Sequence, residues 1–132
     1  MRIAVVVPCW DNPSDVHRCL QALVEQSYQD FETVIVDDGS TPAIPKFQIP
    51  NSKFQIRLIR QPHAGAPAAR NHGARETESE FLLFLDSDIV LAPHALERLA
   101  AALDAHPGAS YAYSGFRFGW KRFASYPFDA DR

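Results

Sequence analysis

Apolar residues in this chain form short continuous runs, which alternate with segments where apolar residues recur every three or four positions. The continuous runs are rich in Val, Ile, Leu and Phe, and such runs are typical of buried β-strands. We predict strands at residues 2–8, 31–40, 54–61, 80–88 and 110–120. The helical spacing predicts amphipathic helices at residues 13–26, 67–76 and 92–106.

Residues with known preferences for helix ends support these boundaries. Asn12 is expected at the N-cap of the first helix, with Pro13 at its first position, and Pro67 is expected near the start of the second. Pro107 ends the third helix. Residues 41–55 contain three prolines and no helical period, so we expect an irregular crossover there.

Strands that alternate with helices indicate an α/β fold, with a mainly parallel sheet flanked by helices. The length of 132 residues favours a single domain over residues 1–132. The last residues contain no evident closing element, and we therefore expect a truncated domain.

Composition narrows the class of protein. The chain is 46% hydrophobic and 22% charged, with a net charge of −3 and no cluster of Lys and Arg, which argues against a nucleic-acid partner. No apolar run approaches the roughly 20 residues of a transmembrane helix, and the apolar start is too short for a signal peptide. We expect a cytoplasmic protein in which Cys9 and Cys19 are reduced.

Three of the predicted strands carry polar residues at their carboxyl ends, at residues 8–11, 37–40 and 86–88. In an open parallel sheet, ligands bind beyond the carboxyl ends of the strands. We therefore expect these three loops, which are far apart in the sequence, to meet at one edge of the sheet and to form one site.

Four segments resemble family 2 glycosyltransferases of the GT-A fold, in their nucleotide-binding half. They are VVVPCWDNP, VIVDDGST, GAPAARNHGA and FLLFLDSD, and they occur in that order over nearly the whole chain. The resemblance implies a Rossmann-like domain that binds a nucleotide-diphosphate sugar, with a UDP-sugar as the first expectation. It also implies inverting transfer of the sugar, with dependence on a divalent cation, Mn²⁺ or Mg²⁺.

The Asp-X-Asp segment is the expected metal site. Mn²⁺ and Mg²⁺ prefer oxygen ligands, and side chains at i and i+2 of an extended segment point the same way, so Asp86 and Asp88 are expected to share a site. The resemblance makes Asp88 the metal ligand and places Asp86 near the ribose or the waters of the metal. The alternative is a surface turn whose aspartates cap the next helix.

The resemblance assigns further residues to the nucleotide. Asp38 is expected to accept a hydrogen bond from the base, with Asp37 nearby, although an ordinary Asp-Gly turn is the alternative. Arg70 is expected near the diphosphate or the base, and otherwise is a solvated helix arginine. The first loop contributes Pro8, Trp10 and Asp11, where Trp10 either covers the nucleoside or packs in the core. His63 and His72 are interpreted as ordinary residues.

The general base of the reaction is not found among these motifs. The resemblance implies an acidic residue in a second half of the domain, beyond Arg132, so we expect this chain to bind the donor without catalysing transfer alone. The acceptor stays open among carbohydrate, lipid and protein, as does peripheral attachment to the inner membrane face. A non-catalytic nucleotide- or nucleotide-sugar-binding module and a nucleotidyltransferase are the alternative functions.

Overall fold

The computed structural model describes residues 1–46, 55–118 and 121–123. Its main sheet has four parallel strands in the order β3-β2-β1-β4. The strands are β1 (Ile3–Cys9), β2 (Phe31–Asp37), β3 (Gln55–Arg60) and β4 (Phe81–Phe84). The predicted α/β fold with a parallel sheet is confirmed.

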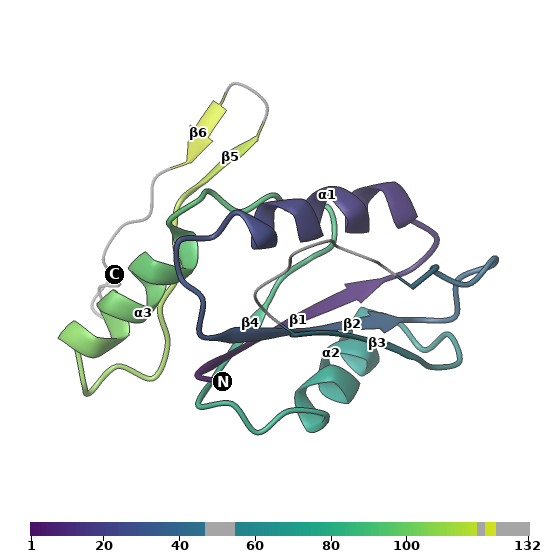
Figure 1. The fold of residues 1–132 in the computed structure, drawn as a ribbon, viewed down its shortest axis with the longest axis horizontal. Helices are drawn as coiled ribbons and strands as arrows, with labels where there is room; N and C mark the ends of the chain where they lie inside the picture. The colour runs from purple at the N-terminus through teal and green to yellow at the C-terminus, as the bar shows by residue number, and fades with distance from the viewer. Residues whose placement is uncertain (47–54, 119–120, 124–132) are drawn as a thin grey trace, which may run out of the picture.

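Helices cover both faces of this sheet, as Figure 1 shows for α1 (Pro13–Val24) above it and α2 (Ala66–Arg75) below it. A third helix, α3 (Ala95–Ala105), lies beside the sheet. One face of β1 and β2 packs with α1 and α3 in the larger core cluster, whereas Val6, Val34 and Val36 pack with Ala69 of α2. No helix among the described residues is long and apolar enough to cross a membrane.

The close packing of α2 on the sheet depends on a glycine. A Cβ atom at Gly73 would overlap Cγ1 of Val6 and would lie 3.1 Å from Cγ2 of Val36. Because there is no side chain at this position, the helix backbone can approach the middle of β1 and β2 directly.

The expectation that the fourth strand is buried is wrong for one of its faces. Leu82 and Phe84 are 44% and 46% exposed. The reason is topological, because β4 is an edge strand and α2 packs mainly on β1 and β2, so the face of β4 that carries these two residues is left uncovered.

The fifth predicted strand is only partly present. Residues 110–115 form no strand, and β5 (Phe116–Phe118) pairs antiparallel with β6 (Lys121–Phe123) outside the parallel sheet. Tyr111 and Tyr113 are exposed, so this stretch lacks the two-sided burial that supports a strand of a parallel sheet. Residues 119–120 of the predicted strand lie outside the described residues.

The third helix begins at Ala95, later than the pattern predicts. The side chain of Gln26, which follows α1, binds the backbone on both sides of this start. Buried Gln26 donates to the carbonyl of Ala92 (2.8 Å) and accepts from the N–H of Leu96 (3.1 Å). This amide therefore fixes the entry of α3 relative to the end of α1.

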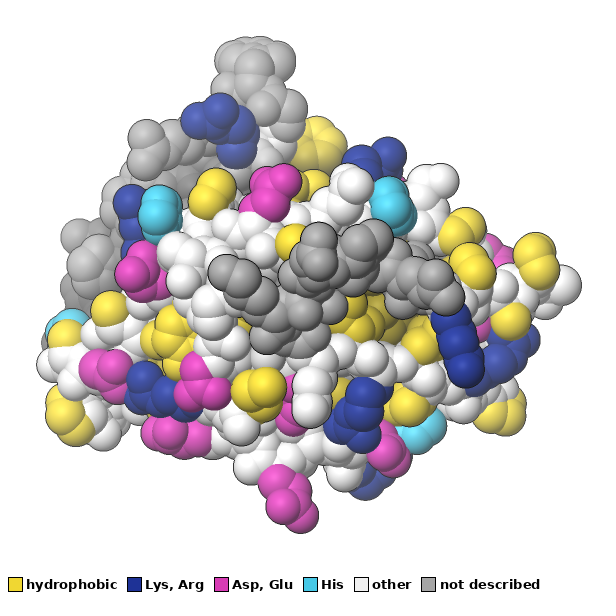
Figure 2. Space-filling model, viewed as in Figure 1, with side chains coloured by type: hydrophobic (Ala, Val, Ile, Leu, Met, Phe, Trp, Pro, Cys, Tyr) yellow, Lys and Arg dark blue, Asp and Glu magenta, His cyan; other side chains and the backbone are white. Residues whose placement is uncertain are grey.

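Charged side chains of both signs are interspersed on the face seen in Figure 2, with apolar side chains between them.

Two ion pairs tie distant elements together at the amino end of the sheet. Arg2 donates to Glu80 (3.2 Å) before β4 and to Asp104 (3.1 Å) in α3. These carboxylates raise the pKa of the Arg2 guanidinium.

Candidate functional site

Four loops meet at the carboxyl edge of the parallel sheet, and hydrogen bonds link them. Asp11, after β1, donates its N–H to Oγ of Ser40 (2.9 Å) and accepts from the N–H of Thr41 (2.8 Å), both after β2. Asn12 donates to Oγ of Ser87 (2.6 Å), after β4. The structure thus brings together the three loops that the sequence predicted would meet. Asp11 adopts a left-handed backbone (φ 53°) to do this.

Pro8 determines where the loop after β4 leaves the sheet. Leu85 donates its N–H to the carbonyl of Val6 (3.0 Å), so in this parallel ladder the next β1 residue facing β4 is Pro8. Proline has no N–H to offer to the carbonyl of Leu85, and pairing of β4 ends there. By ending the pairing of β4, the buried Pro8 sets the point at which the loop that carries Asp86 begins.

Asn12 lies at the N-cap position of α1, as predicted, but its side chain makes no cap hydrogen bond. Its Oδ1 instead accepts from the N–H of Trp10 (3.0 Å), and its amide nitrogen bonds Ser87. Asn12 is of a residue type that commonly caps helices, but here its side chain links the loop after β1 to the loop after β4.

The premise that residues 86–88 form an extended segment is wrong. The prediction that Asp86 and Asp88 share a site stays a prediction. The N–H of Ile89 donates to the carbonyl of Asp86 (3.0 Å), which closes a turn. Asp86 Oδ1 accepts from Arg70 Nη2 of α2 (2.8 Å). Asp88 is exposed and, within the described part of the chain, makes no hydrogen bond or ion pair.

The donor set of this loop fits a hard divalent cation, because carboxylate oxygens are the ligands that Mg²⁺ and Mn²⁺ prefer. Over residues 1–46, 55–118 and 121–123, no group of three or more His, Cys, Asp or Glu side chains gathers around one point. A cation at Asp86 and Asp88 would therefore need water or substrate oxygens to complete its coordination, as is usual for Mg²⁺ beside a phosphate.

Asp37 is buried, and all of its contacts are internal. Its carboxylate accepts from the N–H groups of Ser40 (2.9 Å) and Ile44 (3.0 Å) and from Arg60 (2.7 Å). Burial alone would raise the pKa of Asp37, but these hydrogen bonds and the Arg60 charge outweigh it and lower the pKa. The carboxylate therefore stays ionised and holds the turn after β2.

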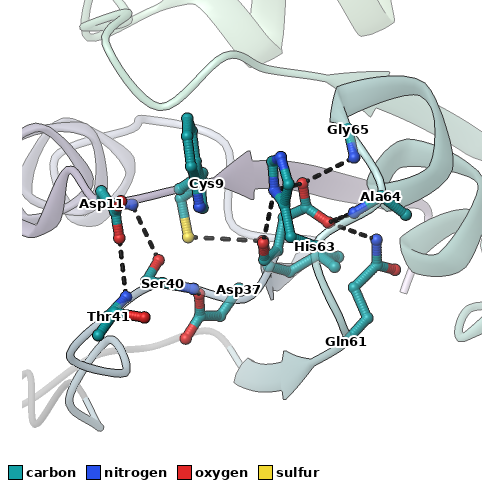
Figure 3. Close-up of polar contacts among 12 residues, drawn as sticks. Cys9, Asp11, Asp37, Ser40, Thr41, Gln61, His63, Ala64 and Gly65 are labelled. Carbon is teal, nitrogen blue, oxygen red and sulfur yellow. Dashed lines mark hydrogen bonds and ion pairs between the residues drawn. The ribbon is translucent and has the colours of Figure 1, made fainter.

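Asp38 is also buried, and it holds the loop that precedes α2. Oδ1 accepts from Gln61 (2.7 Å) and from the N–H of Ala64 (2.9 Å), and Oδ2 accepts from the N–H of Gly65 (2.9 Å), as Figure 3 shows. Burial opposes ionisation here too, but these bonds lower the pKa of Asp38. The prediction that Asp37 or Asp38 contacts a base stays a prediction, since the structure gives both carboxylates protein partners.

Trp10 is not a core aromatic residue, because it is 53% exposed. Its ring stacks on the imidazole of His63, with centroids 4.3 Å apart and planes inclined by 24°. Beside this pair lies a hollow of about 500 Å³ lined by Gly39, Arg60, Gln61, Pro62 and His63. Gly39 has a left-handed backbone (φ 80°), and a Cβ there would lie 2.7 Å from the backbone nitrogen of His63.

The loop after β3 is the part of the site that sequence reasoning missed. This loop supplies Gln61 and His63, and Arg60 is the last residue of β3 before it. His63 was interpreted as an ordinary residue. The signal was available, because the segment RQPH lies at the carboxyl end of a predicted strand, as the other three polar segments do.

The two cysteines near the site carry free, buried thiols. Burial raises the pKa of Cys9 and of Cys19 to about 12. The negative charge of Asp88 is a further cause for Cys19, which places that carboxylate within electrostatic reach of α1. Such thiols stay protonated at neutral pH, so the site is not built for a cysteine nucleophile.

Comparisons with known proteins identify relatives of this chain. The sequence model of glycosyl transferase family 2 matches residues 4–129. An uncharacterized glycosyltransferase of Haemophilus influenzae is 30% identical over 112 residues, covering 84% of this chain and 37% of the relative. Glycosyltransferase GlyA of Streptococcus pneumoniae is 34% identical over 89 residues, covering 66% of this chain and 13% of the relative. The chain thus spans little more than a third of these relatives, or less.

Solved structures share the fold. S. aureus TarS 1–349 in complex with UDP-GlcNAc superposes with a TM-score of 0.69 at 28% identity, covering 81% of this chain and 32% of that one. The mannosyltransferase PcManGT from Pyrobaculum calidifontis, in complex with GDP-Man and Mn²⁺, has a TM-score of 0.65 at 21% identity, covering 77% and 32%. The family match over nearly the whole chain, together with this fold, shows that the chain belongs to glycosyl transferase family 2 and has the GT-A fold.

Proposed function

We propose that this chain forms the donor-binding part of an inverting glycosyltransferase and binds a nucleotide-diphosphate sugar, most simply a UDP-sugar. The observation that carries the proposal is the meeting of four polar loops at one sheet edge, where Trp10, Arg70, Asp86 and Asp88 are all at least partly exposed. The likeness to a chain solved with UDP-GlcNAc supports the choice of ligand.

The reaction that we propose is a single displacement. The oxygen of an acceptor hydroxyl attacks the anomeric carbon and gives up its proton to a general base, the bond from that carbon to the phosphate oxygen breaks, and the nucleotide diphosphate leaves with the bonding electrons. Negative charge grows on the leaving group, so a fixed cation beside it lowers the barrier. Arg70 would provide this charge, because its guanidinium already lies at the site edge against Asp86.

Asp88 and Asp86 would hold the divalent cation, Mn²⁺ or Mg²⁺. When bound, the cation would supply Lewis-acid compensation for the diphosphate charge. Asp88 is the better-placed ligand, since within the described residues nothing else engages its carboxylate, whereas one Asp86 oxygen already accepts from Arg70.

Trp10 would cover the nucleoside, because its half-exposed ring stands at the rim of the site. Asp11, Asp37 and Asp38 would act by shaping the loops around it. Asp11 and Asp38 accept from neighbouring loops, and Asp37 holds the turn that follows its own strand. The general base beyond Arg132, the acceptor and the cytoplasmic or peripheral membrane location stay predictions.

Isothermal titration tests the proposal. The chain is titrated with UDP and UDP-GlcNAc, each with and without Mn²⁺. We expect binding that strengthens with Mn²⁺, and a loss of about tenfold or more in Asp88→Asn and in Arg70→Ala, because each removes a charged contact to the diphosphate or its cation.

Exposed residues elsewhere provide matched controls. Glu78→Gln and Arg98→Ala remove the same charges from exposed positions away from the four loops and should leave binding unchanged. If the unaltered chain binds no nucleotide with Mn²⁺ present, or if the controls weaken binding as much as the site variants, the proposal is wrong.

A further inference from the structure

The side chain of Asn12 does not do what its position in the chain favours. Asn12 stands at the N-cap of α1, since its carbonyl accepts from the N–H of Val16 (3.2 Å), and Asn is among the best N-cap residues. Its side chain nevertheless makes no cap hydrogen bond, so α1 goes without a contact that would stabilise it. Departures from local preference of this kind are expected at functional sites.

The contacts of Asn12 fix how its amide is oriented. The N–H of Trp10 is a donor, so the atom that it meets at 3.0 Å must be the carbonyl oxygen, Oδ1. The amide nitrogen Nδ2 then faces Oγ of Ser87 at 2.6 Å and donates to it. The two residues are 75 positions apart in the chain, so this bond joins the loop after β1 to the loop after β4.

Ser87 is the middle residue of the Asp-X-Asp segment and the part of it that packs into the protein. It is 6% exposed, whereas the flanking Asp86 and Asp88 are exposed. The N–H of Ile89 donates to the carbonyl of Asp86 (3.0 Å), which puts Ser87 and Asp88 at the two central positions of a turn. Asn12 therefore holds this turn by its buried side and leaves both carboxylates exposed.

Two side chains from elsewhere hydrogen-bond to this turn, within the part of the chain that the structure describes. Arg70 donates to Asp86 (2.8 Å), and Asn12 donates to Ser87. Under the proposed function, Arg70 contacts the diphosphate and Asp86 binds the cation, so ligands compete for the first of these bonds. The bond between Asn12 and Ser87 involves neither group, and it can hold the turn with or without ligands.

We infer that Asn12 is a positioning residue that acts through Ser87 on the cation site. It holds Asp86 and Asp88 in the arrangement that binds the cation. The inference rests on the proposed function and deepens it, because it names the residue that prepares the site before the cation arrives. Ligand groups that are already held in place lose less conformational freedom on binding, so the cation binds more tightly.

The test measures the cation factor, which is the ratio of UDP affinities with and without Mn²⁺ in isothermal titrations of the chain. Asn12→Ala and Ser87→Ala should each lower this factor by about tenfold, the effect typical of residues that orient metal ligands. In Ser87→Ala, UDP affinity without Mn²⁺ should stay nearly unchanged. The double variant should lose no more than either single variant, because both substitutions remove the same bond.

A third variant separates positioning from helix capping. Ser caps a helix about as well as Asn, but its side chain is too short to bridge Trp10 and Ser87. Asn12→Ser should therefore melt at a higher temperature than Asn12→Ala, while its cation factor is equally low. Gln21→Ala on the exposed surface of α1 and Ser114→Ala in the exposed stretch after α3 are matched controls and should keep the full factor.

The outcomes distinguish this inference from the proposed function. If the unaltered chain binds no UDP, or if Mn²⁺ does not strengthen the binding, the proposed function itself fails. If Mn²⁺ acts on the unaltered chain and equally on folded Asn12→Ala or Ser87→Ala, the inference is overturned. Additive losses in the double variant, or a cation factor that recovers with stability in Asn12→Ser, would also overturn it. Far-ultraviolet circular dichroism and a melting curve establish that each variant is folded.

Discussion

At the scale of single residues, the aspartates of this site fall into two groups, which differ in how many hydrogen bonds their carboxylates accept from the protein. Asp37 and Asp38 are buried and each accepts several hydrogen bonds, whereas Asp88 is exposed and accepts none within the described residues. A carboxylate that protein donors already saturate stabilises a loop, and one without such donors is available to a ligand.

The first prediction concerns Asp37 and pH. Its folded-state pKa is lowered below the ordinary 3.8, so the ionised form stabilises the fold fully above about pH 4, and this contribution is lost as pH falls through the folded pKa. Asp37→Asn should lower the free energy of unfolding by about 1–3 kcal/mol at pH 7, because it weakens the bonds to Ile44 and Arg60.

Urea unfolding at neutral and acid pH measures this effect. The difference between Asp37→Asn and the unaltered chain should shrink as pH is taken well below 4. Asp88→Asn, which loses no described contact, should show almost no difference at either pH. An equal loss of stability at all pH values would contradict the assigned role of the ionised carboxylate.

The residue scale also shows what sequence alone can and cannot predict. The acidic residues and their loops were predicted from residue type and from their position after strands. The partners of Asp38 lie 23 to 27 residues further along the chain, so no local pattern around Asp38 shows that its acceptors are occupied. For the same reason His63 was missed, since its role depends on a contact to Asp38 that only the fold creates.

At the scale of elements, Pro8 connects the central strand to the exposed acidic loop. Pro8→Ala restores an N–H on the side of β1 that faces β4. We expect the ladder to extend by one rung and to draw Asp86 into it. Stability should change by less than about 1 kcal/mol, while UDP affinity in the presence of Mn²⁺ should fall several-fold.

Hydrogen exchange of the backbone amides and titration with UDP together measure these two effects of Pro8→Ala. The new N–H at position 8 should be protected from exchange, and UDP binding should weaken. Pro107→Ala, at an exposed position after α3, should change neither quantity. Unaltered UDP affinity in Pro8→Ala with a protected N–H would show that the end of β4 has no bearing on the site.

Helix α2 provides a second prediction at this scale. Gly→Ala in a helix interior usually stabilises a protein by about 0.5–1 kcal/mol. At Gly73 we expect the opposite, a loss of about 1–3 kcal/mol, because the added methyl group would collide with Val6 and crowd Val36 across the sheet interface.

Chemical unfolding of Gly73→Ala measures the loss, with Gly108→Ala as the control. A Cβ at Gly108 meets no atom within 4 Å, so that variant should be close to neutral. A stabilised Gly73→Ala would mean that α2 is not packed on β1 and β2 as closely as described.

The elements themselves were predicted best where burial is two-sided. β1 and β2 are buried along almost their whole length, and their continuous apolar runs identified them. The errors came where the same kind of apolar run lies at an edge, as in β4, or outside the parallel sheet, as around Tyr111. An apolar run shows that a segment favours burial, but not whether another element covers it.

At the scale of the whole molecule, the parallel sheet is the frame that makes one site from four distant loops. All four strands run the same way, so their carboxyl ends lie at one edge, and Arg2, Asp30 and Glu80 mark the opposite edge. Strand alternation was enough to predict this arrangement, because it depends on topology and not on the details of packing.

The central claim, that these loops form one cation-dependent nucleotide site, is tested most directly by nuclear magnetic resonance of the isotope-labelled chain with UDP and Mn²⁺. Bound Mn²⁺ broadens the signals of nearby nuclei. The account predicts broadening or shifts at Trp10, Asp38, His63, Arg70 and Asp88, with the signals of Arg2, Asp30 and Glu80 unchanged. Responses at the amino edge, or none at the carboxyl edge while UDP binds, would contradict it.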